Sequence, residues 1–228
     1  MQCVILAAGK GTRMRPLTDT LPKPLVTVCG QNILDHIVLA LPAVVTEIIL
    51  VVGYKSEHIK AHCQEEFHGR KVQYVEQQNF SGGTGDALLC AKPLITGKFL
   101  FMYADDIHGA EALTKVVKED HGMLAVHSDT PERFGVLVKN ADGTLQKIIE
   151  KPKNPPTNLV NIGGFVAEPS LLTYTAAKSV LGEVYVTDMF SAYAADNPVK
   201  IIEQDQWLPI GYPEDVVRAE AVLCPKVD

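Results

Sequence analysis

Positive side chains gather in a short glycine-containing loop near the start of the sequence. An apolar run at residues 4–8 leads into two closely spaced glycines, and Lys10, Arg13, Arg15 and Lys23 follow within fifteen residues. Glycine lets backbone amides approach an anion closely, because no Cβ atom intervenes. The sequence as a whole carries a net charge of −6, so this local positive charge indicates a small anionic ligand and not nucleic acid.

Two familiar phosphate-binding motifs do not fit this loop. A Walker A motif would need glycine where Val4 stands, and serine or threonine where Gly11 stands. The dinucleotide-binding pattern G-x-G-x-x-G would need glycine where Met14 stands. The loop therefore predicts a different kind of nucleotide site.

The loop resembles the signature of the sugar-phosphate nucleotidylyltransferases, also called nucleotide-sugar pyrophosphorylases. These include glucose-1-phosphate thymidylyl- and uridylyltransferases and the pyrophosphorylase domain of N-acetylglucosamine-1-phosphate uridylyltransferase. Their pattern is approximately L-x-x-G-x-G-T-R-L/M-x-P-L-T-x-x-x-P-K-x-L, which residues 6–25 match. Later segments resemble further family motifs in the same order along the chain: GGTGDA at 82–87, YADDI at 103–107, RFGVL at 133–137, IIEKP at 148–152, NIGGF at 161–165 and WLPIGYPEDVVRA at 207–219.

The resemblance implies roles for individual residues. The expected catalytic residues are Arg13 on the β,γ-phosphates, Lys23 on the phosphates around the reacting centre, and Asp105 as a ligand of Mg²⁺. The expected nucleotide-binding residues are Leu6, Ala7, Gly9, Gly11, Thr12, Gln78, Gly83 and Thr84, with Gln77 as the rival of Gln78 for reading the base. The expected sugar-phosphate-binding residues are Tyr103, Gly135, Glu150, Lys151 and Asn161.

Elementary chemistry agrees with this inventory of charged residues. A sugar-1-phosphate oxygen attacks the α-phosphorus of a nucleoside triphosphate and pyrophosphate leaves. The nucleophile is already anionic, so no general base is needed, and the protein must instead offset repulsion between two polyanions. That requirement favours Arg, Lys and a divalent cation, whereas a related glycosyltransferase would need a D-x-D motif that ADDI at 104–107 does not supply.

The expected reaction joins a nucleoside triphosphate to a sugar 1-phosphate. A glutamine amide matches the imide edge of uracil or thymine, so UTP or dTTP is expected, with glucose or N-acetylglucosamine 1-phosphate. A guanylyl- or cytidylyltransferase of the same family, or a weakly active regulatory homologue, remains an alternative. The alternative of a regulatory homologue rests on Pro209, which stands where the family carries a second metal-binding aspartate. Asp106, Asp205 and Asp215 are the candidates to supply the missing carboxylate.

The elements that must position these residues follow from hydrophobic patterning. Continuous apolar runs at 3–8, 47–53, 72–76 and 98–105 predict strands buried on both faces of a parallel sheet. Helical spacing at 32–42, 56–67 and 84–94 lies between them, which predicts β-α units with right-handed crossovers. After residue 120, shorter strands, a hairpin turn at 142–143 and helices near 168–178, 187–195 and 213–223 are expected.

The fold class expected is therefore α/β: a Rossmann-like, doubly wound mixed sheet of the nucleotide-diphospho-sugar transferase type, in three α/β/α layers. We expect a single domain over 1–228, with a nucleotide-binding half at about 1–115 and a sugar-binding half at about 116–228. The last expected helix ends close to the end of the sequence, so one activity is expected.

Location and partners follow from composition. Five scattered cysteines without a C-x-x-C pair predict free thiols in a reducing compartment, and no leader or membrane span is expected, which favours a cytoplasmic enzyme. The expected partners are the two substrates, with no nucleic acid and no membrane, and a homo-oligomer is compatible with the sequence.

Overall fold

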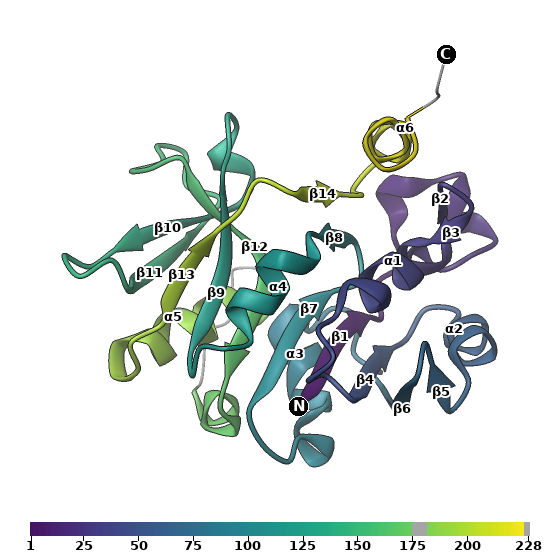
Figure 1. Ribbon diagram of the computed structural model, residues 1–228, viewed down its shortest axis with the longest axis horizontal. Helices are drawn as coiled ribbons and strands as arrows, with labels where there is room; N and C mark the ends of the chain where they lie inside the picture. The colour runs from purple at the N-terminus through teal and green to yellow at the C-terminus, as the bar shows by residue number, and fades with distance from the viewer. Residues whose placement is uncertain (175–181, 226–228) are drawn as a thin grey trace.

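A mixed β-sheet runs through the chain in the computed structural model, which describes residues 1–174 and 182–225 (Figure 1). Its strand order is β11-β10-β12-β7-β1-β4-β6-β5, and β9 pairs with β12 and β13. The strands are β1 (Gln2–Ala7), β4 (Glu47–Val52), β5 (Glu66–Phe67), β6 (Arg70–Glu76), β7 (Phe99–Tyr103), β9 (Gly122–His127), β10 (Gly135–Lys139), β11 (Leu145–Glu150), β12 (Leu159–Ala167) and β13 (Lys200–Glu203). Two further pairs are β2 (Thr27–Val28) with β3 (Gln31–Asn32), and β8 (Asp106–His108) with β14 (Trp207–Pro209).

The four expected apolar strands form the parallel centre of this sheet. β1 pairs in parallel with β4 on one side and with β7 on the other, and β6 follows β4. Alternate side chains of β1 enter two different cores: Cys3 and Ile5 on one face, Val4 on the other. Burial on both faces explains why β1, β4 and β7 are apolar without alternation. The expectation fails for β6, in which only Val72 is buried. The chain order reverses between β1 and β7, because the second and third parallel strands lie to one side of β1 and the fourth lies to the other.

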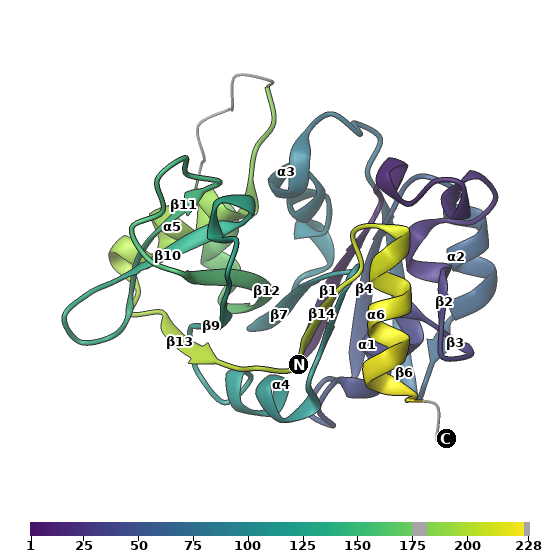
Figure 2. The same ribbon diagram turned by 90° about the horizontal axis from the view of Figure 1, so that it is seen from above.

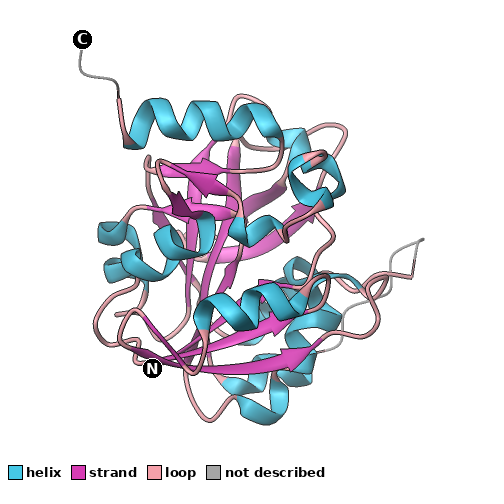
Figure 3. Cartoon of the chain, turned by 90° about the vertical axis from the view of Figure 1, so that its right-hand side faces the viewer, coloured by secondary structure: helices cyan, strands magenta, loops and turns pink. Residues whose placement is uncertain are grey.

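Helices cover both faces, which confirms the three-layer α/β/α architecture. The helices that pack on one face are α1 (Ile33–Ala40), α2 (Ser56–Cys63), α4 (Ala110–Val116) and α6 (Pro213–Leu223). The helices on the other face are α3 (Gly83–Cys90) and α5 (Val186–Asp196), as Figure 2 shows from above. Figure 3 shows the last helix, α6, along one edge of the molecule, far from the N-terminus. No helix in the two described stretches is long and apolar enough to cross a membrane.

The second half of the chain extends the same sheet with antiparallel strands. β10 and β11 form the expected hairpin, with Gly143 at φ 85 in its turn, and β12 pairs antiparallel with β7. The helix expected near 168–178 is a short 3₁₀ helix at Pro169–Thr173, and positions 175–178 lie outside the described residues. Strands β8, β13 and β14 and helix α4 are elements that the sequence patterns did not predict.

The prediction of five free cysteines is wrong. Cys29 and Cys224 form a disulfide bond across a sequence separation of 195 residues, while Cys3, Cys63 and Cys90 are free. The bond joins the turn between β2 and β3 to the end of α6. Spacing alone could not reveal it, because the two cysteines meet only through the tertiary fold.

Candidate active site

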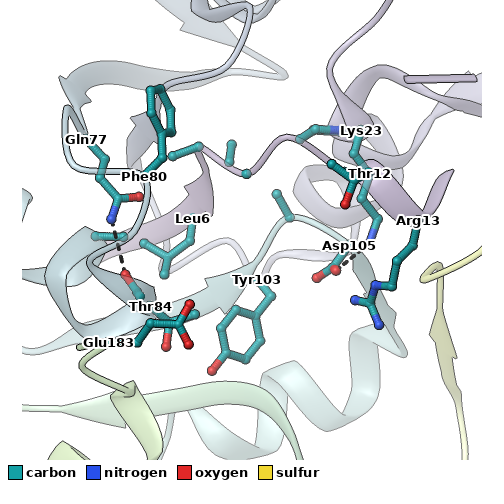
Figure 4. Close-up of a pocket in the computed structure, with 18 of the residues that line it drawn as sticks. Leu6, Thr12, Arg13, Lys23, Gln77, Phe80, Thr84, Tyr103, Asp105 and Glu183 are labelled. Atoms are coloured by element: carbon teal, nitrogen blue, oxygen red, sulfur yellow. Dashed lines mark hydrogen bonds and ion pairs between the residues drawn. The ribbon is translucent and has the colours of Figure 1, made fainter. Parts of the chain in front are cut away.

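A cavity of about 390 Å³ opens beyond the carboxyl ends of β1 and β7, where the strand order reverses. Ligands of open α/β sheets bind at such a position. Figure 4 shows side chains of the opening loop, of α3 and of the β7 end around this cavity. The expected nucleotide-side and catalytic residues that line it are Leu6, Ala7, Gly9, Gly11, Thr12, Arg13, Lys23, Gly83, Thr84 and Asp105, and the expected sugar-side residue Tyr103 lines it too.

The opening loop is folded by its own short-range contacts. Gly11 has φ 60, a left-handed conformation that side chains rarely adopt, and the carbonyl oxygen of Gly11 accepts a hydrogen bond from Thr18 Oγ1 at 2.8 Å. A Cβ atom at position 11 would lie 3.0 Å from Lys23 Cβ, so glycine also lets the lysine pack against the loop. Lys23 is buried, and its Nζ atom lies 2.5 Å from Asp105 Oδ2. The loop thus delivers one positive charge directly to the end of β7.

The glutamine that lines this cavity is Gln77, and Gln78 is exposed and lies outside the lining. Gln77 is buried, and its Nε2 atom donates to Gly83 O at 3.2 Å and to Asp86 Oδ2 at 3.1 Å. The structure thus places the rival, Gln77, in the cavity wall, and which of the two glutamines reads the base stays a prediction. The local sequence did not settle the choice, because the residues after β6 leave the strand and lose its alternation.

A second cavity, of about 880 Å³, adjoins the first on the side of β10, β11 and β12. The expected sugar-side residues that line it are Tyr103, Gly135, Glu150, Lys151 and Asn161. Four residues line both cavities: Arg13, Thr84, Tyr103 and Asp105. We call these four residues the shared wall. A ligand in each cavity would therefore meet the other at a charged boundary.

Polar contacts fix the sugar-side residues. Asn161 is buried, and its amide nitrogen lies 3.4 Å from Gly135 O. A Cβ atom at position 135 would be 2.3 Å from that nitrogen, so glycine is needed there for space. Thr187 Oγ1 donates to Glu150 Oε2 at 3.3 Å, and Lys151 Nζ lies 3.5 Å from Glu150 Oε1. A carboxylate, an ammonium group and an amide thus lie around one cavity.

Two carboxylates follow β7 in succession. Desolvation, together with the charge of Asp105, raises the pKa of Asp106, and the indole of Trp207, whose Nε1 donates to Asp106 Oδ1 at 2.9 Å, opposes that rise. Pro209 pairs with Asp106 in the β8–β14 ladder, and both residues line the larger cavity. No group of three or more His, Cys, Asp or Glu residues that could hold a metal ion occurs within 1–174 and 182–225. Any cation here would take most of its ligands from elsewhere.

The other candidate replacements for the missing carboxylate are less suited. Asp205 is exposed and does not line either cavity. Asp215 lines the larger cavity, but its Oδ2 atom accepts hydrogen bonds from the backbone nitrogens of Gly211 and Tyr212 at the start of α6. Asp106 is therefore the best candidate of the three, because it directly follows Asp105 and does not cap a helix.

Tyr212 joins the opening loop to the second half of the chain. The guanidinium of Arg13 lies 5.2 Å from the centre of the Tyr212 ring, and that of Arg133 lies 6.0 Å from it. A hydrogen bond and the positive charge from Arg13, helped by Arg133, lower the pKa of the Tyr212 phenol. Attraction between guanidinium groups and an aromatic face holds such an arrangement together.

Several lining residues escaped the sequence analysis. Phe80 lies over the smaller cavity, as Figure 4 shows, and Glu183 reaches it from the segment before α5. That segment is anchored beside α3, because Gly85 N donates to Val184 O at 2.7 Å. Arg133 and Thr187 line the larger cavity. Only Arg133 lay in a motif that the sequence had singled out.

Comparison with known proteins now identifies the family. The profile of the nucleotidyl transferase family matches residues 2–225. The chain belongs to this family. The glycine loop, the buried lysine and the two successive carboxylates all lie within the residues that the family profile matches.

Two curated nucleotidyl transferase relatives are each 37% identical to the chain. One is the bifunctional protein GlmU of Methanococcus aeolicus, matched over 100% of this chain and 55% of the relative. The other is UTP–glucose-1-phosphate uridylyltransferase AglF of Haloferax volcanii, matched over 98% of this chain and 96% of the relative. The chain thus spans about half the length of the bifunctional relative and nearly all of the other.

Solved structures share the fold. A Bacillus anthracis protein, described as a candidate glucose-1-phosphate thymidylyltransferase in complex with sucrose, has a TM-score of 0.88 and is 24% identical; the match covers 100% of this chain and 96% of that one. A UDP-glucose pyrophosphorylase complexed with UDP-glucose has a TM-score of 0.80 at 20% identity, covering 97% of each chain. Both matches extend over both halves of the nucleotidyl transferase chain.

Proposed function

We propose that the chain is a sugar-1-phosphate nucleotidylyltransferase, which condenses a nucleoside triphosphate with a sugar 1-phosphate and releases pyrophosphate. The observation that carries the proposal is the shared wall. Two adjoining cavities, one lined by the glycine loop and one by hydroxyl-binding polar groups, meet at Arg13, Thr84, Tyr103 and Asp105. Two substrates bound there would place their phosphates at the same boundary, which is what a direct transfer requires.

The proposed nucleotide is UTP or dTTP, and the proposed sugar 1-phosphate is of the glucose or N-acetylglucosamine type. Gln77 supports the first choice, because its amide lies in the smaller cavity. Glu150 and Asn161 support the second, because a carboxylate and an amide can both bind sugar hydroxyls. The relative AglF is named as acting on UTP and glucose 1-phosphate, which agrees with both choices.

The residues of the chain would act mainly by position and charge. Arg13 would neutralise charge on the departing pyrophosphate, and Lys23 would contact phosphate oxygens near the reacting phosphorus. Lys151 would hold the phosphate of the sugar, with Glu150 on its hydroxyls. No side chain needs to remove a proton, because the attacking phosphate oxygen is anionic.

Magnesium is the proposed cofactor, and the donor set fits it. Hard oxygen ligands are what Mg²⁺ prefers, and in phosphate-transfer sites it uses one or two carboxylates together with substrate phosphates and water. Asp105 would hold the ion, and Pro209 would leave the site one carboxylate short, with Asp106 as the nearest carboxylate that can replace it. When bound, the ion would offset negative charge on the phosphates.

The chain is proposed to work on small substrates in the cytoplasm, with no membrane or nucleic acid as partner. The net charge of −6 supports the exclusion of nucleic acid. The disulfide between Cys29 and Cys224 is unusual for that compartment.

The deciding experiment measures pyrophosphate release with magnesium over a panel of nucleoside triphosphates and sugar 1-phosphates, and identifies the nucleotide sugar formed. UTP or dTTP with a glucose-type phosphate should give the highest kcat/KM. Preference for GTP or CTP would favour the related guanylyl- or cytidylyltransferases instead. Absence of product with every pair would favour a regulatory homologue. Pro209, which stands in place of a second carboxylate, is the observation that favours this alternative.

A further inference from the structure

The amide of Gln77 is held in one orientation by groups that can only accept hydrogen bonds. Its Nε2 atom contacts the carbonyl oxygen of Gly83 at 3.2 Å and a carboxylate oxygen of Asp86 at 3.1 Å. Neither a carbonyl nor an ionised carboxylate can donate, so the amide nitrogen must face them and the oxygen must face away. Figure 4 shows the Gln77 oxygen on the side of Leu6 and Phe80, which line the cavity.

That oxygen has a free acceptor position. No hydrogen bond to Gln77 Oε1 occurs from any residue in 1–174 or 182–225. The two hydrogens of the amide nitrogen, in contrast, have one protein acceptor each. The donor capacity of Gln77 is therefore already used within the protein, and only its acceptor is available to a base in the cavity.

Asp86 can reach Gln77 because residue 82 is glycine. A Cβ atom at position 82 would lie 2.4 Å from both Cγ and Oδ2 of Asp86. Gly82 has φ −74, a value open to any residue, so its backbone does not demand glycine. The space left by the missing side chain is the space that the Asp86 carboxylate fills. Gly82 and Asp86 of the segment 82–87 are thus both needed for the contact with the Gln77 amide.

We propose that Asp86 is a specificity-determining residue, which fixes the Gln77 amide so that its oxygen selects bases carrying a ring N–H. This inference rests on the proposed function of the chain. Uracil and thymine present an N–H between two carbonyl groups, and guanine also has a ring N–H, so each can donate to Gln77 Oε1. The corresponding ring nitrogen of cytosine or adenine is an acceptor and would face the oxygen lone pairs without a proton between them.

Cytosine is the sharpest comparison, because it has the size of uracil. If Asp86 fixes the amide, the site should bind UTP better than CTP. The difference would come from the direction of the hydrogen bond to the base, because the two bases have similar volumes. An unpaired polar group in a closed site is a strong basis for rejecting a near-isosteric competitor.

The test replaces Asp86 by asparagine, which has the same size but can donate as well as accept. An asparagine can present its own NH₂ group to Gln77, which leaves the Gly83 carbonyl as the one contact that still opposes the turned amide. The Gln77 amide can then turn over more readily and offer a donor to cytosine N3. The ratio of kcat/KM for UTP to that for CTP should fall by about tenfold in Asp86→Asn. The KM for the sugar 1-phosphate should not change.

Matched variants separate this role from general damage. Gly82→Ala should lower the same ratio, because it displaces Asp86 without altering it. Glu76→Gln removes the negative charge of a neighbouring carboxylate, which pairs with Lys60 at 2.6 Å and makes no hydrogen bond to the Gln77 amide within the described residues. It should therefore leave the ratio unchanged. In a Gln77→Ala background, Asp86→Asn should have no further effect on the ratio, since the group that it orients is gone.

Equal loss of activity with UTP and CTP in Asp86→Asn would overturn the inference, because a merely structural residue damages both nucleotides alike. Binding of UTP and CTP, measured by calorimetry in the same variants, gives the ratio independently of turnover. A protein that binds UTP selectively but releases no pyrophosphate would contradict the proposed function while the inference stood.

Discussion

Arg13 lies where both cavities meet, and its guanidinium group is not fixed by a carboxylate among the ion pairs of the described residues. Arg13→Ala should therefore act on the charge that develops as pyrophosphate leaves. We expect kcat to fall at least a hundredfold, which corresponds to about 3 kcal/mol. Steady-state kinetics with both substrates saturating measure this.

Arg15 supplies the matched control for that variant. It lies two residues away and is exposed, and its Nε atom pairs with Asp19 at 3.2 Å. Arg15→Ala removes the same charge from the same loop and should leave kcat nearly unchanged. The role assigned to Arg13 is wrong if Arg13→Ala keeps more than about a tenth of the wild-type kcat.

Variants at Asp105 and Pro209 together test how the activity depends on magnesium. Asp105→Asn should remove nearly all activity, because the only anionic ligand proposed at that position becomes neutral. Pro209→Asp adds a carboxylate opposite Asp106 and should lower the magnesium concentration that gives half-maximal rate. Magnesium titrations of initial rate check both variants, with Asp205→Asn as an exposed control.

The outcomes of the titration distinguish two sites. Full activity in Asp105→Asn would place the metal elsewhere. An unchanged titration in Pro209→Asp would mean that Asp106 already completes the site.

Glu150 should affect one substrate and not the other. It lines only the larger cavity, so Glu150→Ala should raise the KM for the sugar 1-phosphate several-fold while the KM for the nucleotide stays nearly constant. Glu132→Ala removes an exposed carboxylate from the 3₁₀ helix Pro131–Arg133 and should change neither value. Equal changes in both KM values would show that Glu150 organises the whole site.

At the scale of single residues, the sequence predicted best where a motif fixes the position. Arg13, Lys23 and Asp105, which the resemblance singled out, all line the smaller cavity, and Arg13 and Asp105 also line the larger one. Gln77 and not Gln78 lines the smaller cavity, and the sequence could not choose between them because no pattern continues through the loop after β6. Thr187 became visible only in the fold, since it reaches the larger cavity from the start of a distant helix. Tyr212 lay in the segment 207–219, but the motif gave it no role.

Elements were predictable where burial imposes a pattern. Strands β1, β4 and β7 are almost wholly apolar because both their faces are covered, and that pattern is readable without a structure. Strand β6 lies nearer the edge of the sheet and is only partly buried. Strands β8 and β14 hold three residues each, which is too short for any period to appear. They nevertheless carry Asp106 and Pro209, so the least predictable element holds part of the proposed metal site.

The link between α6 and the turn after β2 gives a prediction about stability. Cys224→Ser opens a loop of nearly the whole chain and should lower the free energy of unfolding by about 2–5 kcal/mol in the absence of reductant. Denaturant unfolding measures this, and Cys90→Ser, which removes a free thiol, is the control.

Thiol counting tests the same link without a variant. Alkylation of the unreduced, denatured protein should modify the three free cysteines, Cys3, Cys63 and Cys90. Modification of all five would contradict the disulfide bond and would restore the expectation of free thiols throughout.

For the whole molecule, the sequence predicted the layers but not the order of the strands. Repeated β-α units indicate a doubly wound sheet, yet they do not say on which side of β1 the fourth parallel strand will lie. That choice depends on α3 packing on the opposite face from α1 and α2. The reversal that results is what brings Asp105 beside the glycine loop.

The shared wall has a consequence for the handedness of the reacting phosphorus. Because both substrates would occupy adjoining cavities at once, the sugar phosphate can attack the α-phosphorus directly, from the side opposite to the departing pyrophosphate. A single in-line displacement inverts a chiral centre. UTP that carries sulfur on its α-phosphate, supplied as one diastereomer, should therefore yield a nucleotide sugar of inverted configuration at that phosphorus, which phosphorus NMR can assign. Retention would require two successive inversions, and hence a nucleotide attached for a time to a side chain of the protein.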